Sequence, residues 1–251
     1  MNNLELEQLI NQKLSSDKIN DYAPNGLQVE GKTEIKKIIT GVTASQALID
    51  YAISQSADAI LVHHGYFWKS ESPCIRGMKG KRIKALLLND MNLYGYHLPL
   101  DVHPELGNNA QLAKLLDIEN LQPLEKGAVS IPVWGELKEP MTGENFAEKI
   151  EKVLNRKPLI CIENGPHLIR KIGICTGGGQ GYIDLAAEQG CDAFITGEVS
   201  EQTIHSAREQ GLHFFSAGHH ATERYGIKAL GEWLAKEYGF DVEFKDIDNP
   251  A

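Results

Sequence analysis

Histidines follow apolar runs in this chain, and the first such run is the most informative. Residues 59–62 (AILV) are apolar, and His63, His64 and Gly65 come directly after them. Such a run is typical of a short strand buried on both faces of a parallel sheet, and ligands bind at the carboxyl ends of such strands. Neutral imidazole is the commonest side-chain ligand of transition metals. The pair therefore indicates a metal site, and the alternative is one core histidine beside one that caps a loop.

The positions of His63 and His64 on this strand set a geometric condition. Adjacent residues of a strand point to opposite faces, so the two imidazoles converge only if the strand ends between them. Gly65 permits a turn at that point. We therefore expect the strand to end within the pair.

Two later stretches carry the same kinds of side chain. Residues 92–97 (NLYGYH) are predicted to form a strand that ends at His97, and residues 98–109 (LPLDVHPELGNN) are predicted to form a loop. Residues 218–223 (GHHATE) follow another predicted strand and open the last helix. His219 and Glu223 are four positions apart, so on a helix they share one face, as two metal ligands do. The alternative for this pair is an ordinary surface contact.

The complete candidate set mixes imidazoles and carboxylates and contains no thiolate. Such donors suit zinc, iron, manganese or nickel. The set exceeds what one tetrahedral ion can use, and carboxylates can bridge, so we expect two divalent ions about 3.5–4 Å apart. A pair of this kind lowers the pKa of a shared water and holds a transferring oxygen. The candidates are His63, His64, His97, Asp101, His103, His219, His220 and Glu223.

An internal repeat indicates how these segments are positioned. Residues 171–196 repeat residues 37–62 at a constant offset of 134 positions, which is the mark of a duplicated unit. Each copy reads as strand, helix, strand, helix and strand, and the third strand leads to His97 or to His219. We therefore predict an α/β fold of two similar domains related by internal duplication, with the metal site in the cleft between them.

Composition shifts toward proline and glycine between residues 121 and 139. We place the boundary there, with a first α/β domain of residues 1–125 and a second of residues 126–251. In this arrangement the C-terminal helix can pack back on the first domain. We further expect helices at residues 4–14, 44–55, 79–89 and 144–154, and Asn108 or Asn109 as the cap of the helix after the histidine-rich loop.

A glycine-rich segment, residues 176–181 (TGGGQG), lies between a predicted strand and a helix. It lacks both the Gly-Lys-Ser/Thr of a P-loop and the spacing of a dinucleotide fingerprint. We expect it to allow close approach of the backbone to the cleft, where it could receive an anionic group of a substrate. Residues 66–68 (YFW) are expected to pack in a loop, and the alternative is stacking on a substrate ring.

Composition and net charge limit the kinds of partner and the location that this protein can have. The chain has 251 residues, 42% of them hydrophobic, and a net charge of −9 with a pI near 5.5. This charge argues against binding to nucleic acid or to anionic membranes, since both need a basic surface. The N-terminal residues do not resemble a signal peptide, and no run is long enough to span a membrane. Four cysteines without a paired pattern indicate reduced, buried thiols and a cytoplasmic protein.

Three of these segments resemble one known family. HHG at residues 63–65, YHLPLDVHPELGNN at 96–109 and GHHATE at 218–223 are similar to the signature segments of the Nif-three-like, YbgI-type proteins, also known as type 2 homologues of GTP cyclohydrolase 1. GLQVEG at 26–31 and TGEVSEQTIHSAREQG at 196–211 extend the resemblance over the whole chain.

The resemblance implies two α/β domains, a dinuclear metal centre between them and a ring-shaped homohexamer. It implies His63, His64, Asp101, His219 and Glu223 as metal ligands. His97, His103 and His220 would then orient these ligands or face a substrate.

Two classes of function fit this sequence. The first is a metal-dependent hydrolase of the cyclohydrolase or phosphoesterase type, acting on a nucleotide or a pterin-type substrate. The second is a non-catalytic metal protein, either a ring-shaped scaffold or a metal-handling factor. Spare histidines favour the first, because a structural zinc site is closed by four ligands.

Overall fold

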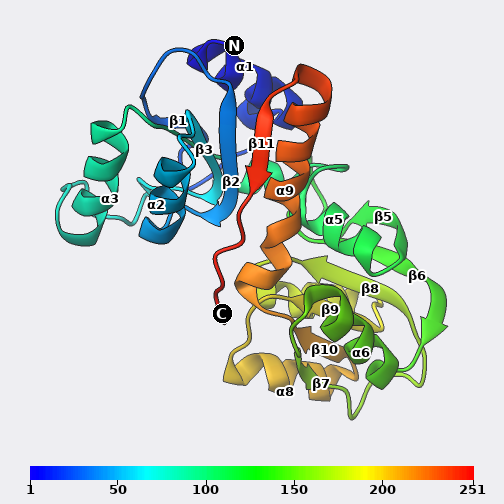
Figure 1. Ribbon diagram of the computed structural model, residues 1–251. Coiled ribbons are helices and arrows are strands. Elements are labelled where there is room, and N and C mark those ends of the chain that lie inside the picture. Colours follow the sequence, from blue (N-terminus) through cyan, green and yellow to red (C-terminus); the bar gives the residue numbers. More distant parts are fainter. The chain divides into compact units, whose positions relative to one another are not determined.

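The computed structural model describes residues 1–251 and divides the chain into two compact units. Unit 1 consists of Met1–Leu106 and Gly226–Asp248, and unit 2 of Gly107–Tyr225 and Asn249–Ala251. Each unit is built on one β-sheet (Figure 1). No helix has the length and apolar character needed to cross a membrane.

Unit 1 contains a five-stranded sheet of order β1-β4-β3-β2-β11. Strands β2, β3, β4 and β11 run parallel, and β1 pairs antiparallel with β4. The elements are α1 (Asn3–Leu14), a short 3₁₀ turn η1 (Ser16–Lys18), β1 (Gly26–Val29), β2 (Lys37–Thr43), α2 (Gln46–Ser54), β3 (Ala59–His64), α3 (Gly77–Leu88), β4 (Asn92–Gly95), α4 (Leu98–Val102), most of α9 (His219–Tyr238), and β11 (Asp241–Phe244).

Alternate residues of the unit 1 strands enter two apolar layers. On β3, Leu61 packs with residues of α1 and α9, whereas Ile60 and Val62 pack with residues of α2 and α3. The sheet is therefore covered on both faces, with α2 and α3 on one side (Figure 1). This arrangement confirms that the run of residues 59–62 is a strand buried on both faces.

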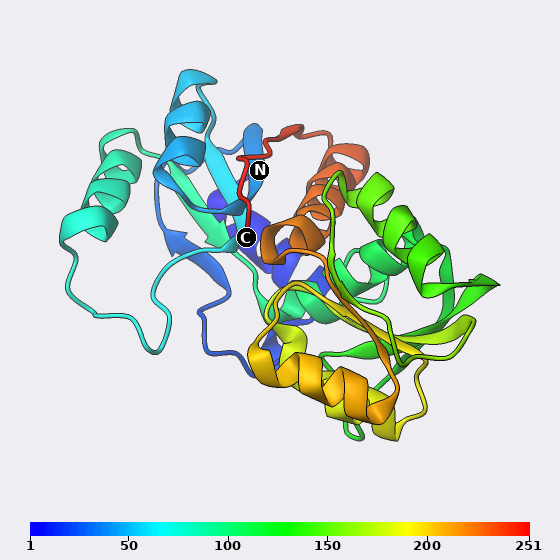
Figure 2. The same ribbon diagram turned by 90° about the horizontal axis from the view of Figure 1, so that it is seen from below.

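Unit 2 contains a six-stranded sheet of order β5-β6-β8-β9-β10-β7, in which β8, β9 and β10 are parallel. Helices α5 and α6 cover one face, and α7 and α8 cover the other (Figure 2). The elements are α5 (Asn108–Leu115), β5 (Ile118–Pro123), β6 (Val133–Met141), α6 (Gly143–Leu154), β7 (Leu159–Cys161), β8 (Ile169–Cys175), a 3₁₀ turn η2 (Gly179–Tyr182), α7 (Ile183–Glu188), β9 (Ala193–Thr196), α8 (Glu201–Gln210) and β10 (His213–Ser216).

The predicted α/β class is confirmed, and the proline- and glycine-rich stretch forms β5 and β6 within unit 2. The expected loop after His97 differs from the structure, because α4 forms there with a proline in its first turn, where proline fits a helix. The expected asparagine cap of α5 is also wrong. Gly107 occupies that position, and the side-chain amide of Asn109 donates to the carbonyl of Ile131 instead, at 2.7 Å.

None of the four cysteines forms a disulfide, and three of them are buried. Burial raises the pKa of Cys161 and of Cys191 to about 11, so both remain thiols at neutral pH. Cys74 is exposed, in the segment that leads into α3, so the prediction that all four are buried is wrong for this residue.

Candidate metal centre

Three histidines of unit 1 lie together at the ends of β3 and β4. One potential ligand atom from each of His63, His64 and His97 lies within 4.8 Å of the others. The rings of His63 and His64 are 4.5 Å apart between centroids. The two therefore converge as expected, but β3 runs through His64, so the expectation that the strand ends between them is wrong.

Each of these rings has a partner at Nδ1. Nδ1 of His63 lies 2.9 Å from the carbonyl oxygen of Tyr96, and Nδ1 of His64 lies 3.3 Å from Oγ1 of Thr43. Nδ1 of His97 lies 2.9 Å from Oδ1 of Asp21. These contacts leave Nε2 of each ring as the nitrogen that a metal would take. Histidine ligands of metals show this arrangement, in which the second nitrogen donates to a carbonyl or carboxylate.

Asp101 joins the group from α4. Its Oδ1 lies 3.5 Å from Nε2 of His63, and both side chains are buried. The helical turn of α4 fixes where this carboxylate stands relative to His97, which precedes the turn. Unit 1 thus holds three imidazoles and one carboxylate that can bind a metal ion.

Gly65 is needed for packing rather than for a turn. A Cβ atom at Gly65 would lie 2.0 Å from Oε1 of Gln28. That oxygen accepts a hydrogen bond from the backbone N–H of Tyr66, at 2.8 Å. The close approach of Gln28 therefore fixes the backbone directly after the two histidines.

Asp21 is a residue of this site that the sequence analysis missed. Its Oδ1 lies 2.9 Å from Nδ1 of His97, and the two side chains are 3% and 9% exposed. Burial raises the pKa of Asp21, but hydrogen bonds from His97 and Asn25 outweigh it and hold the pKa well below its usual range. Residues 22–26 read only as a turn, and nothing in the sequence links Asp21 to a histidine 76 positions later.

Unit 2 holds a second group of potential ligands. Helix α9 begins at His219, so His219 and Glu223 stand one turn apart as predicted, with Nε2 and Oε2 3.1 Å from each other. Nδ1 of His219 lies 2.8 Å from Oε1 of Glu198. Burial lowers the pKa of His219, but Glu223 and then Glu198 outweigh it and raise the pKa to about 9.

Glu198 was also missed as a functional residue, although the repeat contains a signal for it. At the offset of 134 positions, Glu198 stands where His64 stands in the first copy. A side chain at that position therefore belongs beside the candidate ligands in unit 2, as His64 does in unit 1.

The glycine-rich segment contacts the ligands of unit 2. Gly177 has a φ of +65°, and a Cβ atom there would lie 2.0 Å from Oε1 of Glu223. The backbone N–H of Gly177 donates to Oγ1 of Thr222, at 3.0 Å. The expected close approach of this backbone is thus directed at the carboxylate of Glu223.

Three further predictions concern His103, His220 and the aromatic residues 66–68, whose contacts are as follows. Nδ1 of His103 accepts hydrogen bonds from the backbone N–H groups of Glu105 and Leu106, at 3.2 and 3.0 Å, as in a turn. The backbone N–H of His220 donates to the carbonyl of Ala251, at 3.2 Å. Trp68 packs edge-on against His97 with ring centroids 4.8 Å apart, so one of the three aromatic residues 66–68 borders the unit 1 group.

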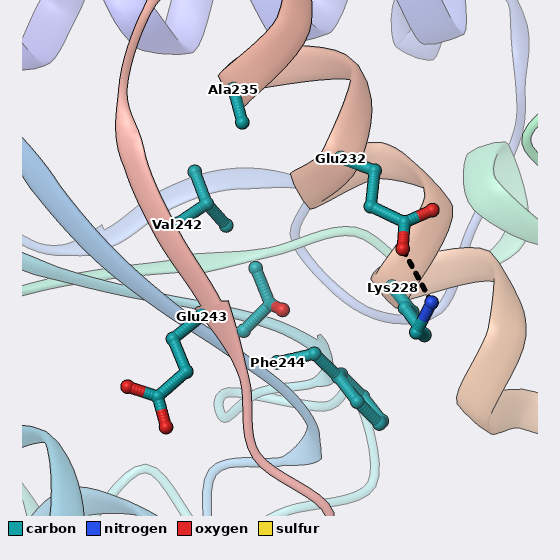
Figure 3. Close-up of a pocket in the computed structure, with 7 residues that line it drawn as sticks. Lys228, Glu232, Ala235, Val242, Glu243 and Phe244 are labelled. Carbon is teal, nitrogen blue, oxygen red and sulfur yellow. Dashed lines mark hydrogen bonds and ion pairs between the residues drawn. The ribbon is translucent and has the colours of Figure 1, made fainter.

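A separate pocket of unit 1 contains none of these candidates. It has a volume of about 350 Å³ and lies between α9 and β11, where Lys228 pairs with Glu232 (Figure 3). Gly231 brings α9 close to the sheet here, because a Cβ atom would lie 2.8 Å from Cγ2 of Thr40. The residues that line the pocket are Thr40, Lys228, Glu232, Ala235, Val242, Glu243 and Phe244.

The fold and these groups define an α/β protein with histidine and carboxylate clusters that can bind metal. The model of one family, Duf34/NIF3 (NGG1p interacting factor 3), matches residues 1–250. The chain belongs to this family, and the resemblance noted in the sequence is confirmed.

Relatives at high identity bear a single name. A protein of Haemophilus influenzae named "GTP cyclohydrolase 1 type 2 homolog" is 96% identical over 251 residues, which is all of both chains. The solved structure titled "Structural genomics, protein ybgI, unknown function" is 64% identical, covers 100% of both chains and has a TM-score of 0.97. The solved structure of TTHA1606 from Thermus thermophilus is 32% identical over 100% of both chains, with a TM-score of 0.90.

Proposed function

We propose that this chain is a dinuclear metal-dependent hydrolase whose ligands are His63, His64, Asp101, His219 and Glu223. His97, His103 and His220 would surround them, to orient ligands or to face the substrate. The observation that carries the proposal is the set of Nδ1 partners of His63, His64 and His219: a carbonyl, a hydroxyl and a carboxylate. Imidazoles fixed in this way are pre-organised to bind a metal through Nε2.

The donor set also fits the ions that the proposal requires. Three imidazoles and two carboxylates suit divalent zinc, iron, manganese or nickel. When bound, two such ions supply Lewis-acid activation and lower the pKa of a water. The chain's own part is to hold the ligands rigidly: Tyr96, Thr43 and Glu198 orient the imidazoles, and the Gly177 backbone packs against Glu223.

The substrate class in this proposal is a nucleotide or a pterin-type compound. The name of the relatives, GTP cyclohydrolase 1 type 2 homolog, supports this choice. We also propose that two similar domains, residues 1–125 and 126–251, arose by duplication and place the metals in the cleft between them. Assembly as a ring-shaped homohexamer in the cytoplasm completes the proposal.

The test combines metal analysis with turnover. Protein purified without chelators should contain about two divalent ions per chain by elemental analysis, and light scattering should give six times the 27.8 kDa of one chain. Metal-loaded protein is then assayed against GTP, reduced pterins and a panel of phosphoesters. Hydrolysis that disappears with chelator and in His64→Ala supports the proposal.

Two outcomes would contradict it in different ways. Absence of bound metal under all loading conditions would remove the dinuclear centre. Retained metal with no turnover on any substrate would indicate the non-catalytic metal protein.

A further inference from the structure

A buried hydrogen bond joins two distant segments of unit 1. Asp21 lies in the segment between α1 and β1, and His97 directly follows β4. Oδ1 of Asp21 and Nδ1 of His97 are 2.9 Å apart, although the residues are 76 positions apart in the chain. Residues so far apart in the chain come into contact only when the unit is folded.

The carboxylate of Asp21 is fixed on both oxygens. Oδ1 also accepts from the backbone N–H groups of Tyr22 and Ala23, at 2.7 and 3.1 Å. Oδ2 accepts from the side-chain amide of Asn25 at 3.0 Å and from the backbone N–H of Leu98 at 2.9 Å. An ionised carboxylate only accepts hydrogen bonds, so Nδ1 of His97 must carry the proton that it shares with Asp21.

The ring of His97 is held by further contacts. Tyr22 and Trp68 pack edge-on against it, with centroid distances of 5.0 and 4.8 Å. The backbone N–H of His97 donates to Oδ1 of Asn25, at 2.8 Å. The ring therefore has one orientation, with His63 and His64 as neighbours at centroid distances of 5.1 and 5.9 Å.

We propose that Asp21 is a positioning residue for the proposed metal-dependent site: it holds His97 as the tautomer with the proton on Nδ1 and so presents Nε2 to a substrate beside His63 and His64. This inference rests on the proposed function for the role of His97. The tautomer itself does not depend on any metal. A purely structural role, in which Asp21 only accepts from Leu98 at the start of α4, would not fix the tautomer.

The first test uses the wild-type protein without metal. Long-range ¹H–¹⁵N NMR separates the two neutral imidazole tautomers, and at a pH of about 8 an ordinary histidine is neutral. His97→Gln assigns the signal. We expect His97 to carry its proton on Nδ1, in contrast to the Nε2–H form usual for free imidazole side chains. His97 with its proton on Nε2 would overturn the inference, whatever the variants do.

The second test compares Asp21→Asn with Asp17→Asn, an exposed aspartate of the preceding 3₁₀ turn. A neutral amide is a weaker acceptor than a carboxylate. Asp21→Asn should therefore shift His97 toward the Nε2–H form, while Asp17→Asn should not. An unchanged tautomer in folded Asp21→Asn protein would overturn the assignment.

The activity measurement then separates this inference from the proposed function. Asp21→Asn should keep wild-type metal content and lose about 10–100-fold in turnover, as is typical when the partner of a functional histidine is removed. Wild-type turnover in a folded Asp21→Asn variant with a shifted tautomer would show that His97 does not serve the substrate. Absence of turnover in wild type contradicts the proposed function, and the tautomer result still decides the role of Asp21.

Discussion

Nε2 of His219 lies 3.1 Å from Oε2 of Glu223 in the first turn of α9. In metal-free protein this contact is an ion pair, because burial lowers the pKa of the imidazole less than Glu223 and Glu198 raise it. The same two atoms are proposed metal ligands, so a proton and a metal ion compete for the imidazole. Several measurable effects follow from this competition.

The first prediction concerns the pH dependence of stability in chelator-treated protein. Burial lowers the pKa of His219, but Glu223 and Glu198 raise it to about 9, above the ordinary value of about 6.5. The stabilising contribution is therefore fully present below about pH 6.5 and is lost as the pH rises through about 9. The melting temperature should fall over this range, by roughly 2–4 °C for each kcal/mol lost. Glu223→Gln should flatten the curve, and an equally steep curve in that variant would contradict the assignment.

Glu198→Gln tests the orientation of His219. Because the carboxylate of Glu198 accepts from Nδ1 of His219, its loss should weaken metal binding by about 10–100-fold. Glu198 is about half exposed, so the fold should persist. Competition with a chromogenic chelator measures the affinity, and Glu209→Gln on the exposed face of α8 is the control. Equal affinity in both variants would show that Glu198 does not orient the ligand.

Substitutions at two neighbouring glycines provide a test variant and a matched control for the role of the glycine-rich segment. Gly177→Ala places a methyl group 2.0 Å from Oε1 of Glu223 at a φ of +65°, so it should displace Glu223 and reduce metal content. In Gly178→Ala the nearest atom is Oε2 of Glu198 at 3.6 Å, which is ordinary contact, so metal content should stay at the wild-type value. Elemental analysis measures the metal content of both variants. Loss of metal in Gly178→Ala alone would contradict this account of the loop.

The ligands of unit 1 are tested by His64→Ala and Asp101→Ala. His64 is the last residue of β3 and Asp101 lies in the short helix α4, and neither belongs to an apolar cluster, so we expect folded protein with less than half of the wild-type metal. Circular dichroism reports the fold, and elemental analysis reports the metal. Unfolded protein with unchanged metal per folded chain would argue against these residues as ligands.

Removal of metal should also lower stability. A ligand that binds only the native state contributes about 4 kcal/mol at a thousand-fold excess over Kd. Chelator should therefore lower the melting temperature of wild-type protein by several degrees. A melting temperature that chelator does not change would indicate that metal is absent or weakly bound.

The sequence predicts the elements of the fold well where apolar periodicity is strong. The run of residues 59–62 and the spacing of His219 and Glu223 predict a strand and a helical start that the structure contains. Strand β11 was missed, because Asp241–Phe244 alternates charged and apolar residues over only four positions. Its pairing with β2 depends on tertiary structure.

The candidate site is predicted only in part for the same reason. Histidine and carboxylate ligands are recognisable by residue type, whereas Asp21 and Glu198 act through residues 76 and 21 positions away. Such partners are set by how the chain folds back on itself. The helical turn of α4 was missed because two prolines in residues 98–109 suggested an irregular loop, although proline is compatible with the first turn of a helix.

Unit 1 is completed by a segment, Gly226–Asp248, that follows most of unit 2 in the chain. Residues 1–106 supply four of its strands, but β11 and the part of α9 from Gly226 onward come only after the whole of residues 107–225. During synthesis, the face of this sheet that includes Leu61 and Tyr94 can pack against α1 but lacks α9 while unit 2 emerges. Unit 2 can fold from a nearly continuous segment as it leaves the ribosome. A chain that ends before Gly226 would therefore contain every strand of unit 2 but would lack β11 and the part of α9 that packs on the unit 1 sheet.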